Sequence, residues 1–351
     1  MTHQSADRAE QFRQIRAGLT WGWSIIAVCL AIATRNSWPP EVPLSTEITI
    51  LAIGVAIIGV PHGALDHRVA EDVLKARFPS NWLSLFSIGY LSLAALVLVG
   101  FWLAAPLMLV LFLLASVLHF GLGDASYVEY PAPLAWIEIV LMGAIPIILP
   151  WVIFTDDVAM LFGWLANTDA VRWQNPFSAT WVISLFLLAL IAFFTVRFFR
   201  KAAGSTLPIG GSPTETAREE RTRFVVELLC TLALFATLSP LLAFTWYFCG
   251  LHAPRHLLAL AERLLHTRQR TPWAALGWVL LQSLPLTLIT IAGAVFGLHC
   301  LQSQGLEAGL ESGIEANRVR VIFWGLAALT FPHMLLTAIW DHQLGNPFRR
   351  L

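Results

Sequence analysis

Two pairs of side chains have a spacing that could serve metal chemistry. His252 and His256 are four residues apart, and so are His62 and Asp66. Residues four apart on a helix project from the same face, so two imidazoles could share a metal ion and a carboxylate could orient an imidazole. Pro254 could distort the helix between the two histidines or open a cavity there. Since all these groups border apolar segments, where they are costly beside lipid, we expect them to serve a function.

The surrounding sequence is typical of a helical membrane protein. Of its 351 residues, 57% are hydrophobic and 13% are charged, and the mean hydropathy is +0.69. Apolar segments of about twenty residues, long enough to cross a bilayer as helix, recur along the chain. We therefore expect an all-α, polytopic transmembrane bundle of about ten spans (eight to ten) that forms a single domain over residues 1–351.

The predicted spans cover residues 17–35, 45–61, 82–104, 106–122, 133–154, 177–198, 224–242, 243–263, 273–299 and 319–340. The seventh and eighth, which meet near Ser239-Pro240, could be one broken helix. Basic residues gather in the tail 1–16 and in the polar segment 201–223, so the positive-inside rule places both of these and both termini in the cytoplasm. We interpret 201–223, which is rich in Gly, Ser and charge, as a flexible linker between two halves of the bundle.

Charge and cysteine content exclude some classes of function. Lys plus Arg and Asp plus Glu both number 22, so no basic surplus exists to bind nucleic acid. The four cysteines occur singly in apolar segments without a C-x-x-C pair, which favours small apolar packing residues over a zinc site or disulfides. We expect a multi-pass protein of the inner (cytoplasmic) membrane, with the lipid bilayer as its surroundings.

The predicted topology brings histidines from three spans together. Spans 45–61, 106–122 and 243–263 run in the same direction, and their histidines come out at similar depth near the cytoplasmic side, with one of them a turn deeper. These histidines are His62, His119, His256 and the deeper His252. A neutral set of imidazoles with open positions suits Fe(II) and oxygen chemistry, although imidazole also binds zinc and copper. The sequence predicts a metal site and leaves the metal open.

Other polar residues nearby have simpler interpretations. A single histidine in a membrane helix, such as His299 or His333, more often packs with a hydrogen bond than binds a metal. Asp66 and Asp124 could orient the histidines, or could simply end helices at the interface. Arg255 could reach cytoplasmic phosphates or pair with a carboxylate.

Five glycines gather near the histidines. Small residues either let helices approach closely or leave room for a bulky ligand, and both interpretations stay open. The glycines are Gly59, Gly63, Gly121, Gly123 and Gly250.

Three strings carry a resemblance to a known family. They read GVPHGALDH at 59–67, HFGLGD at 119–124 and HAPRH at 252–256. Together they resemble the Brp/Blh family of membrane-bound β-carotene 15,15′-dioxygenases of bacteria and archaea, over roughly residues 50 to 342. The resemblance does not cover residues 1 to about 44, and the 201–223 linker is longer and more polar than expected of a compact member.

The resemblance implies an enzyme that uses O₂ to cleave the central 15,15′ double bond of β-carotene into two molecules of retinal. Its cofactor would be Fe(II), and the family's liganding histidines fall on His62, His119, His252 and His256. His67 is left out because five residues of helix turn it about 140° away from His62. No catalytic residue beyond the metal centre is expected, and a microbial rhodopsin would be the partner that receives retinal.

A polyene would enter laterally from the lipid, because a hydrocarbon of roughly 30 Å matches the bilayer core. Five aromatic residues near the histidine strings could line its path. They are Phe120, Tyr127, Trp246, Tyr247 and Phe248.

Other functions remain as alternatives. A transporter or proton pathway could use His and Asp within the bundle, but it would usually place them at mid-membrane. A membrane di-iron desaturase would need an H-x-x-H-H string, which the sequence lacks. A non-catalytic retinal- or carotenoid-binding assembly factor is the third alternative, against which the intact histidine set argues.

Overall fold

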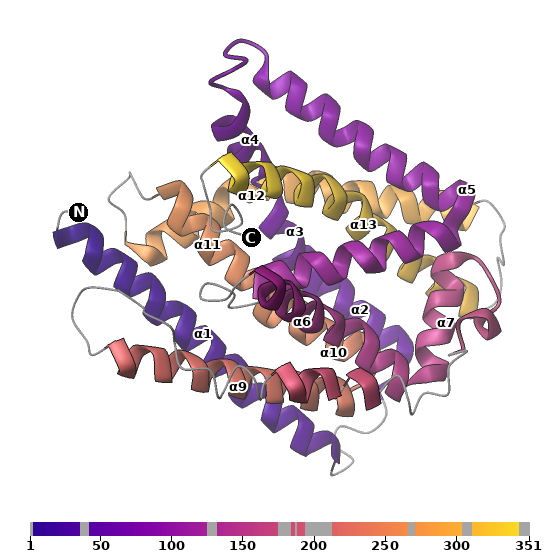
Figure 1. The fold of residues 1–351 in the computed structure, drawn as a ribbon. Helices are drawn as coiled ribbons and strands as arrows, with labels where there is room; N and C mark the ends of the chain where they lie inside the picture. The colour runs from indigo at the N-terminus through magenta and orange to yellow at the C-terminus, as the bar shows by residue number, and fades with distance from the viewer. Residues whose placement is uncertain are drawn as a thin grey trace.

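A computed structural model describes residues 3–35, 42–124, 132–174, 184–186, 188–193, 213–265, 271–303 and 311–343. These residues are helical with short connections, and no strand occurs among them, so the predicted all-α class is confirmed. The first half of the chain contains α1 (His3–Arg35), α2 (Leu44–Gly54), η1 (Val55–Gly59), α3 (Val60–Gly63), α4 (Asp66–Leu74), α5 (Trp82–Asp124), α6 (Ala132–Ile153), α7 (Thr155–Ala166) and η3 (Ala170–Trp173). The second half contains α9 (Pro213–Thr237), α10 (Pro240–Tyr247), η4 (Phe248–His252), α11 (Ala253–Leu265), α12 (Pro272–Ser303) and α13 (Glu311–Gln343) (Figure 1).

Six stretches of the described chain are long and apolar enough to cross a membrane. They are Glu10–Thr34, Leu44–Leu74, Trp82–Asp124, Trp136–Ile153, Pro272–Ser303 and Gly313–Trp340. This supports a membrane protein, whereas the count of about ten spans and the cytoplasmic placement of the termini stay predictions. The predicted span 177–198 lies mostly outside the described residues.

α5 consists of two helices joined by a sharp turn. Ala104 has φ −148° and ψ 54°, outside the helical region, and Pro106 follows without an N–H to continue the hydrogen-bond ladder. A Cβ on Gly100 would lie 2.7 Å from Sδ of Met108, whereas residues eight apart in a straight helix are about 12 Å apart. The chain therefore reverses here, and its two halves run out and back in Figure 1. These halves correspond to the predicted spans 82–104 and 106–122.

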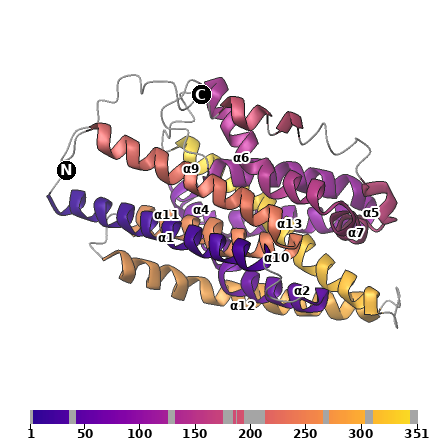
Figure 2. The same ribbon diagram turned by 90° about the horizontal axis from the view of Figure 1, so that it is seen from below.

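The segment predicted as a linker is partly helical. α9 begins at Pro213, so residues 213–223 belong to a helix, while residues 201–212 lie outside the described residues. α9 packs along α1, and Figure 2 shows the two helices side by side. α1 also includes most of the predicted cytoplasmic tail, which continues into the span as one helix. The role of 201–223 as a flexible connection stays a prediction.

A break at Ser239 separates α9 from α10, at the place where the sequence suggested a broken helix. Ser239 is extended, with φ −53° and ψ 150°, and Pro240 begins α10. From Pro240 the helix continues through the π-helical segment η4 into α11. η1 is a second π-helical segment, and it packs against η4. Because π-helical turns are rare and often accompany functional sites, this contact directs attention to the residues beside it.

Candidate metal centre

Five histidines from five elements surround one point in the bundle. They are His62 of α3, His119 of α5, His252 of η4, His256 of α11 and His333 of α13. Nε2 of His252 lies 3.2 Å from Nε2 of His119. One ring nitrogen each from His62, His119 and His333 lies within 4.8 Å of the others. The ring centroid of His256 is 5.5 Å from that of His62 and 5.0 Å from that of His333. The structure thus brings together the four predicted histidines and adds a fifth.

The π-helical segment η1 positions His62. It ends at Gly59, and the short helix α3 follows with Pro61 in its first turn. Nδ1 of His62 contacts the carbonyl oxygen of Gly59. If Nδ1 carries the hydrogen and donates to that carbonyl, Nε2 has a free lone pair. This contact fixes the ring plane and leaves one nitrogen for the cluster.

Glycines allow the two π-helical segments and their neighbours to approach closely. A Cβ on Gly59 would lie 2.8 Å from Cε1 of Phe248 in η4, and a Cβ on Gly123 would lie 2.9 Å from Cε1 of His252. Gly121 faces backbone, since its Cβ would lie 2.0 Å from the carbonyl oxygen of Ile139 in α6. Of the two interpretations of these three glycines, the structure supports close packing over room for a ligand.

Two of the histidines have a carboxylate behind the ring. Nδ1 of His333 is 2.7 Å from Oδ1 of Asp66, and Nδ1 of His252 is 3.4 Å from Oδ2 of Asp124. Asp66 therefore faces His333 rather than His62, the partner that the four-residue spacing suggested. The reason is local, because α3 ends at Gly63 and α4 begins at Asp66, so His62 and Asp66 do not share one helix face.

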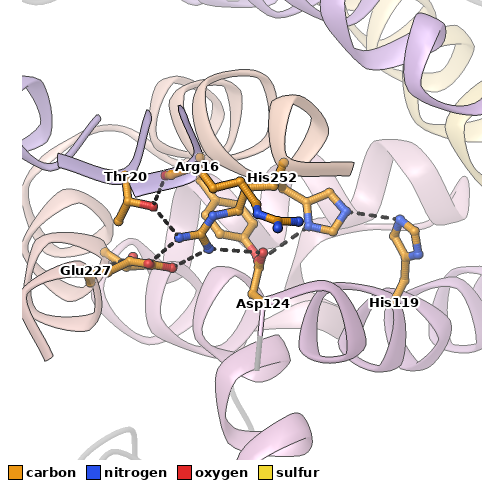
Figure 3. A network of polar contacts seen from close by, with 9 residues as sticks. Arg16, Thr20, His119, Asp124, Glu227 and His252 are labelled. Atoms are coloured by element: carbon orange, nitrogen blue, oxygen red, sulfur yellow. Dashed lines mark hydrogen bonds and ion pairs between the residues drawn. The ribbon is translucent and has the colours of Figure 1, made fainter. Parts of the chain in front are cut away.

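A buried polar network continues from Asp124 away from the histidines (Figure 3). Tyr247 donates its hydroxyl hydrogen to Oδ2 of Asp124. Arg255 lies 3.6 Å from Oδ1 of Asp124 and donates to Oε1 of Glu227 at 2.6 Å and to Oγ1 of Thr20 at 2.8 Å. Of the two alternatives for Arg255, the structure supports pairing with carboxylates. The network joins α1, α5, α9 and α11 behind His252.

An apolar cavity of about 90 Å³ lies near the histidine cluster and is lined by residues of α5, α6, α7, α10 and α13. Phe120 and Phe244 line it. The ring of Phe120 lies 4.9 Å from that of His252 and 5.8 Å from that of His119, so Phe120 contacts both the cavity and the cluster. Phe244 stacks on Phe248 at 5.4 Å, and Phe248 in turn packs edge-on against His62.

The other aromatic residues proposed for a substrate path have different surroundings. Phe248 stands behind Phe244 and does not line the cavity. Tyr247 hydrogen-bonds to Asp124, and the backbone oxygen of Trp246 accepts a hydrogen bond from Trp23. Tyr127 lies outside the described residues. Of the four candidates that the structure describes, Phe120 is the one that contacts both the cavity and the histidines.

The cluster has the donor set and spacing that a metal ion requires. Two imidazole nitrogens on one ion, each about 2.1 Å from it, are roughly 3 to 3.5 Å apart, and the His119–His252 distance of 3.2 Å fits this range. Imidazoles backed by carboxylates are the usual arrangement of metal-binding histidines. Nε2 of His333 is buried and has no hydrogen-bond partner. These residues fit a metal ion held by neutral nitrogen ligands.

His333 is the member of the cluster that the sequence reasoning missed. It was interpreted as a packing residue, and it does make a hydrogen bond, but its ring also faces three other histidines. Two signals could have identified it. Pro332-His333 repeats the Pro61-His62 dipeptide. The last predicted span also runs in the same direction as the three that supplied the other histidines.

Two further histidines lie elsewhere. No ring contact joins His67 to the cluster, in agreement with its exclusion from the predicted ligands, and His299 is exposed on α12. The structure therefore places the first histidine of the PHGALDH string in the cluster and the second outside it.

Comparison with known proteins identifies the family. The sequence model of the β-carotene 15,15′-dioxygenase family matches residues 53–341. A β-carotene 15,15′-dioxygenase of uncultured marine bacterium 66A03 is 27% identical over 80% of this chain and 90% of its own length. A probable β-carotene 15,15′-dioxygenase Blh of Halobacterium salinarum is 24% identical over 94% of each chain. No solved structure matches. The chain therefore belongs to the β-carotene 15,15′-dioxygenase family, and its enzyme class is that of a carotenoid-cleaving dioxygenase.

Proposed function

We propose that this protein uses O₂ to cleave the central 15,15′ double bond of β-carotene into two molecules of retinal, with Fe(II) bound by histidines. The ligands proposed from the sequence are His62, His119, His252 and His256. One observation carries the proposal: the ring of Phe120 lines an apolar cavity and also contacts His252 of the imidazole cluster. Imidazole donors with open positions suit iron and oxygen, and an apolar wall suits a hydrocarbon substrate.

The cavity next to Phe120 is the proposed inner end of the substrate path. At about 90 Å³ it accommodates only part of a carotenoid. The helices around it carry exposed apolar side chains such as Leu114 and Leu118 of α5, which face the surroundings of the bundle. A polyene that arrives through lipid would lay one section along Phe112, Phe120 and Phe244, and this contact would select the double bond that reaches the histidines.

The proposed reaction balances with O₂ as the only co-substrate. The C15=C15′ bond breaks, each of its two carbons receives one oxygen atom, and two aldehydes result without an external reductant. Bound iron would supply the activation of O₂ for this step. The chain itself would hold the polyene, exclude water through its apolar wall and keep the histidine rings fixed through Asp66, Asp124 and Gly59.

The remaining parts of the proposal concern location and partners. We place the protein as a multi-pass protein in the inner membrane, where the lipid bilayer supplies β-carotene. A microbial rhodopsin is the proposed acceptor of retinal. A transporter or proton pathway is the weaker alternative, because the cavity near the histidines is lined by apolar side chains apart from Ser116 and has no charged group in its wall.

Expression in a bacterium that accumulates β-carotene tests the activity. We expect loss of the carotenoid colour and the appearance of retinal, with close to two molecules formed for each β-carotene consumed. Extraction and chromatography of both pigments measure this ratio, and cells with an empty vector are the control. Unchanged β-carotene, or an aldehyde of a different length, would reject the proposed substrate or the proposed bond.

Filling the cavity is expected to impair cleavage without removing the metal. Ser116 is buried in the cavity wall, so Ser116→Phe should occupy the space and lower retinal formation about tenfold, at an overpacking cost of about 1–3 kcal/mol. Leu118→Phe is the matched control, because Leu118 is exposed on the same helix. Retinal and iron are measured in both. Equal activity in the two variants would remove this cavity from the substrate path.

A further inference from the structure

His333 lies in ring contact with three of the four other histidines although it is far from them in sequence. Its ring centroid is 5.0 Å from that of His256, 5.4 Å from that of His62 and 5.5 Å from that of His119. The side chain is buried, with 3% of the residue exposed. α13 thus inserts one imidazole between rings that come from α3, α5 and α11.

The two nitrogens of His333 have different surroundings. Nδ1 is 2.7 Å from Oδ1 of Asp66, a normal hydrogen-bond distance. Nε2 is buried and has no hydrogen-bond partner. An ionised carboxylate only accepts, so Nδ1 must carry the hydrogen, and in a neutral ring Nε2 then has a free lone pair. The hydrogen bond to Asp66 thereby leaves the lone pair of Nε2 available on the ring that contacts the other histidines.

A purely structural role accounts for the contact between Nδ1 and Asp66 but gives Nε2 no partner. A buried polar atom that has lost water and gained no partner costs free energy, so such atoms are rare and require a reason. A hydrogen-bonded packing histidine would satisfy both nitrogens. A metal ion at the centre of the cluster would satisfy Nε2 and, at the same time, explain the carboxylate on Nδ1.

The pair formed by Asp66 and His333 also has a parallel in the same cluster. Asp124 lies behind His252 in the same way, at a longer distance of 3.4 Å. In both pairs the carboxylate faces Nδ1, and Nε2 is the remaining nitrogen. For His252 that nitrogen meets His119 at 3.2 Å. Two histidines of the cluster therefore each have a carboxylate facing Nδ1.

We propose that Nε2 of His333 is a fifth imidazole ligand of the metal centre and that Asp66 is its positioning residue. The inference rests on the metal centre of the proposed function and adds a ligand that the three family strings do not contain. It also assigns Asp66 to His333 rather than to His62. The metal site is then completed only when α13 packs against α3 and α4, which are far from it in sequence.

Metal titration of the purified full-length protein tests the proposal without relying on activity. The protein in detergent is stripped with a chelator and titrated anaerobically with Fe(II), and in parallel with Co(II), whose visible spectrum reports its ligands. His333→Ala is expected to weaken binding of both ions by more than about 100-fold, because loss of a ligand should cost more than loss of a residue that orients one, and to change the Co(II) spectrum. Asp66→Asn is expected to weaken binding by about 10–100-fold while His333 stays in place.

His299→Ala is the matched control, because His299 is an exposed histidine of a neighbouring helix and should leave affinity and spectrum unchanged. His333→Gln keeps the size and polarity of the side chain and repeats the test in a variant that preserves packing. Wild-type affinity and spectrum in His333→Ala or His333→Gln would overturn the inference and leave the proposed function intact. Failure of the wild-type protein to bind either ion would overturn both.

Discussion

Replacing His252 with alanine is expected to lower retinal formation by at least about 100-fold and to deplete the purified protein of iron. Residues that only orient a metal ligand contribute about 10–100-fold to affinity or activity, and a ligand should contribute more. His252 is the proposed ligand with the most defined surroundings. Its Nε2 lies 3.2 Å from that of His119, and its Nδ1 faces Asp124. Loss of the ring would remove a proposed ligand and the contact between the cluster and Asp124.

The measurement combines retinal chromatography in β-carotene-producing cells with metal analysis of purified protein. His67→Ala is the control, since His67 shares a string with His62 but stands outside the cluster, and it should retain activity. Asp124→Asn should fall between the two, about 10–100-fold below wild type, if the carboxylate orients His252. Full activity in His252→Ala would remove it from the ligand set.

Local sequence properties predicted much of the fold. Segment length and hydropathy identified the apolar helices. The boundary between the predicted spans 82–104 and 106–122 coincides with the reversal at Ala104, and Ser239-Pro240 marked the break before α10. The π-helical segments η1 and η4 could not be predicted in this way. They depend on how Gly59 and Phe248 pack, and these residues are far apart in sequence. The helical start of α9 at Pro213 was missed because its polar, Gly-rich surroundings are typical of a linker.

In the site, too, features of single segments could be predicted and contacts between distant segments could not. His62, His119, His252 and His256 could be predicted because spacing and span direction are properties of single segments. The Asp66–His333 pair joins residues 267 apart. The four-residue rule paired Asp66 with His62, since sequence gave no sign that the helix ends at Gly63 and restarts at Asp66. Interactions between distant segments, rather than the residue types, were what the sequence left undetermined.

The second large effect is expected at Arg255, which neutralises two buried carboxylates. Its guanidinium pairs with Glu227 and lies 3.6 Å from Asp124, while its side chain is 18% exposed. Arg255→Ala would leave both acids buried with their cation removed, which typically costs about 3–5 kcal/mol. It should also disturb His252, because Asp124 contacts both side chains. We therefore expect a large drop in thermal stability together with reduced metal content.

Thermal unfolding in detergent, followed by fluorescence of the tryptophans, measures the first effect. Arg16→Ala is the matched control, because the Arg16–Glu262 pair has a similar distance of 2.8 Å but is 38% and 26% exposed, and exposed pairs contribute about 0–1 kcal/mol. The double variant Arg255→Met with Glu227→Gln should recover most of the stability that Arg255→Ala loses. It removes the charge of Glu227 together with that of Arg255, so Glu227 is not left as an unpaired buried charge. If Arg255→Ala unfolds at the same temperature as Arg16→Ala, the network behind His252 has no structural role. A stable Arg255→Ala protein with reduced metal content would instead assign Arg255 to positioning Asp124 and, through it, His252.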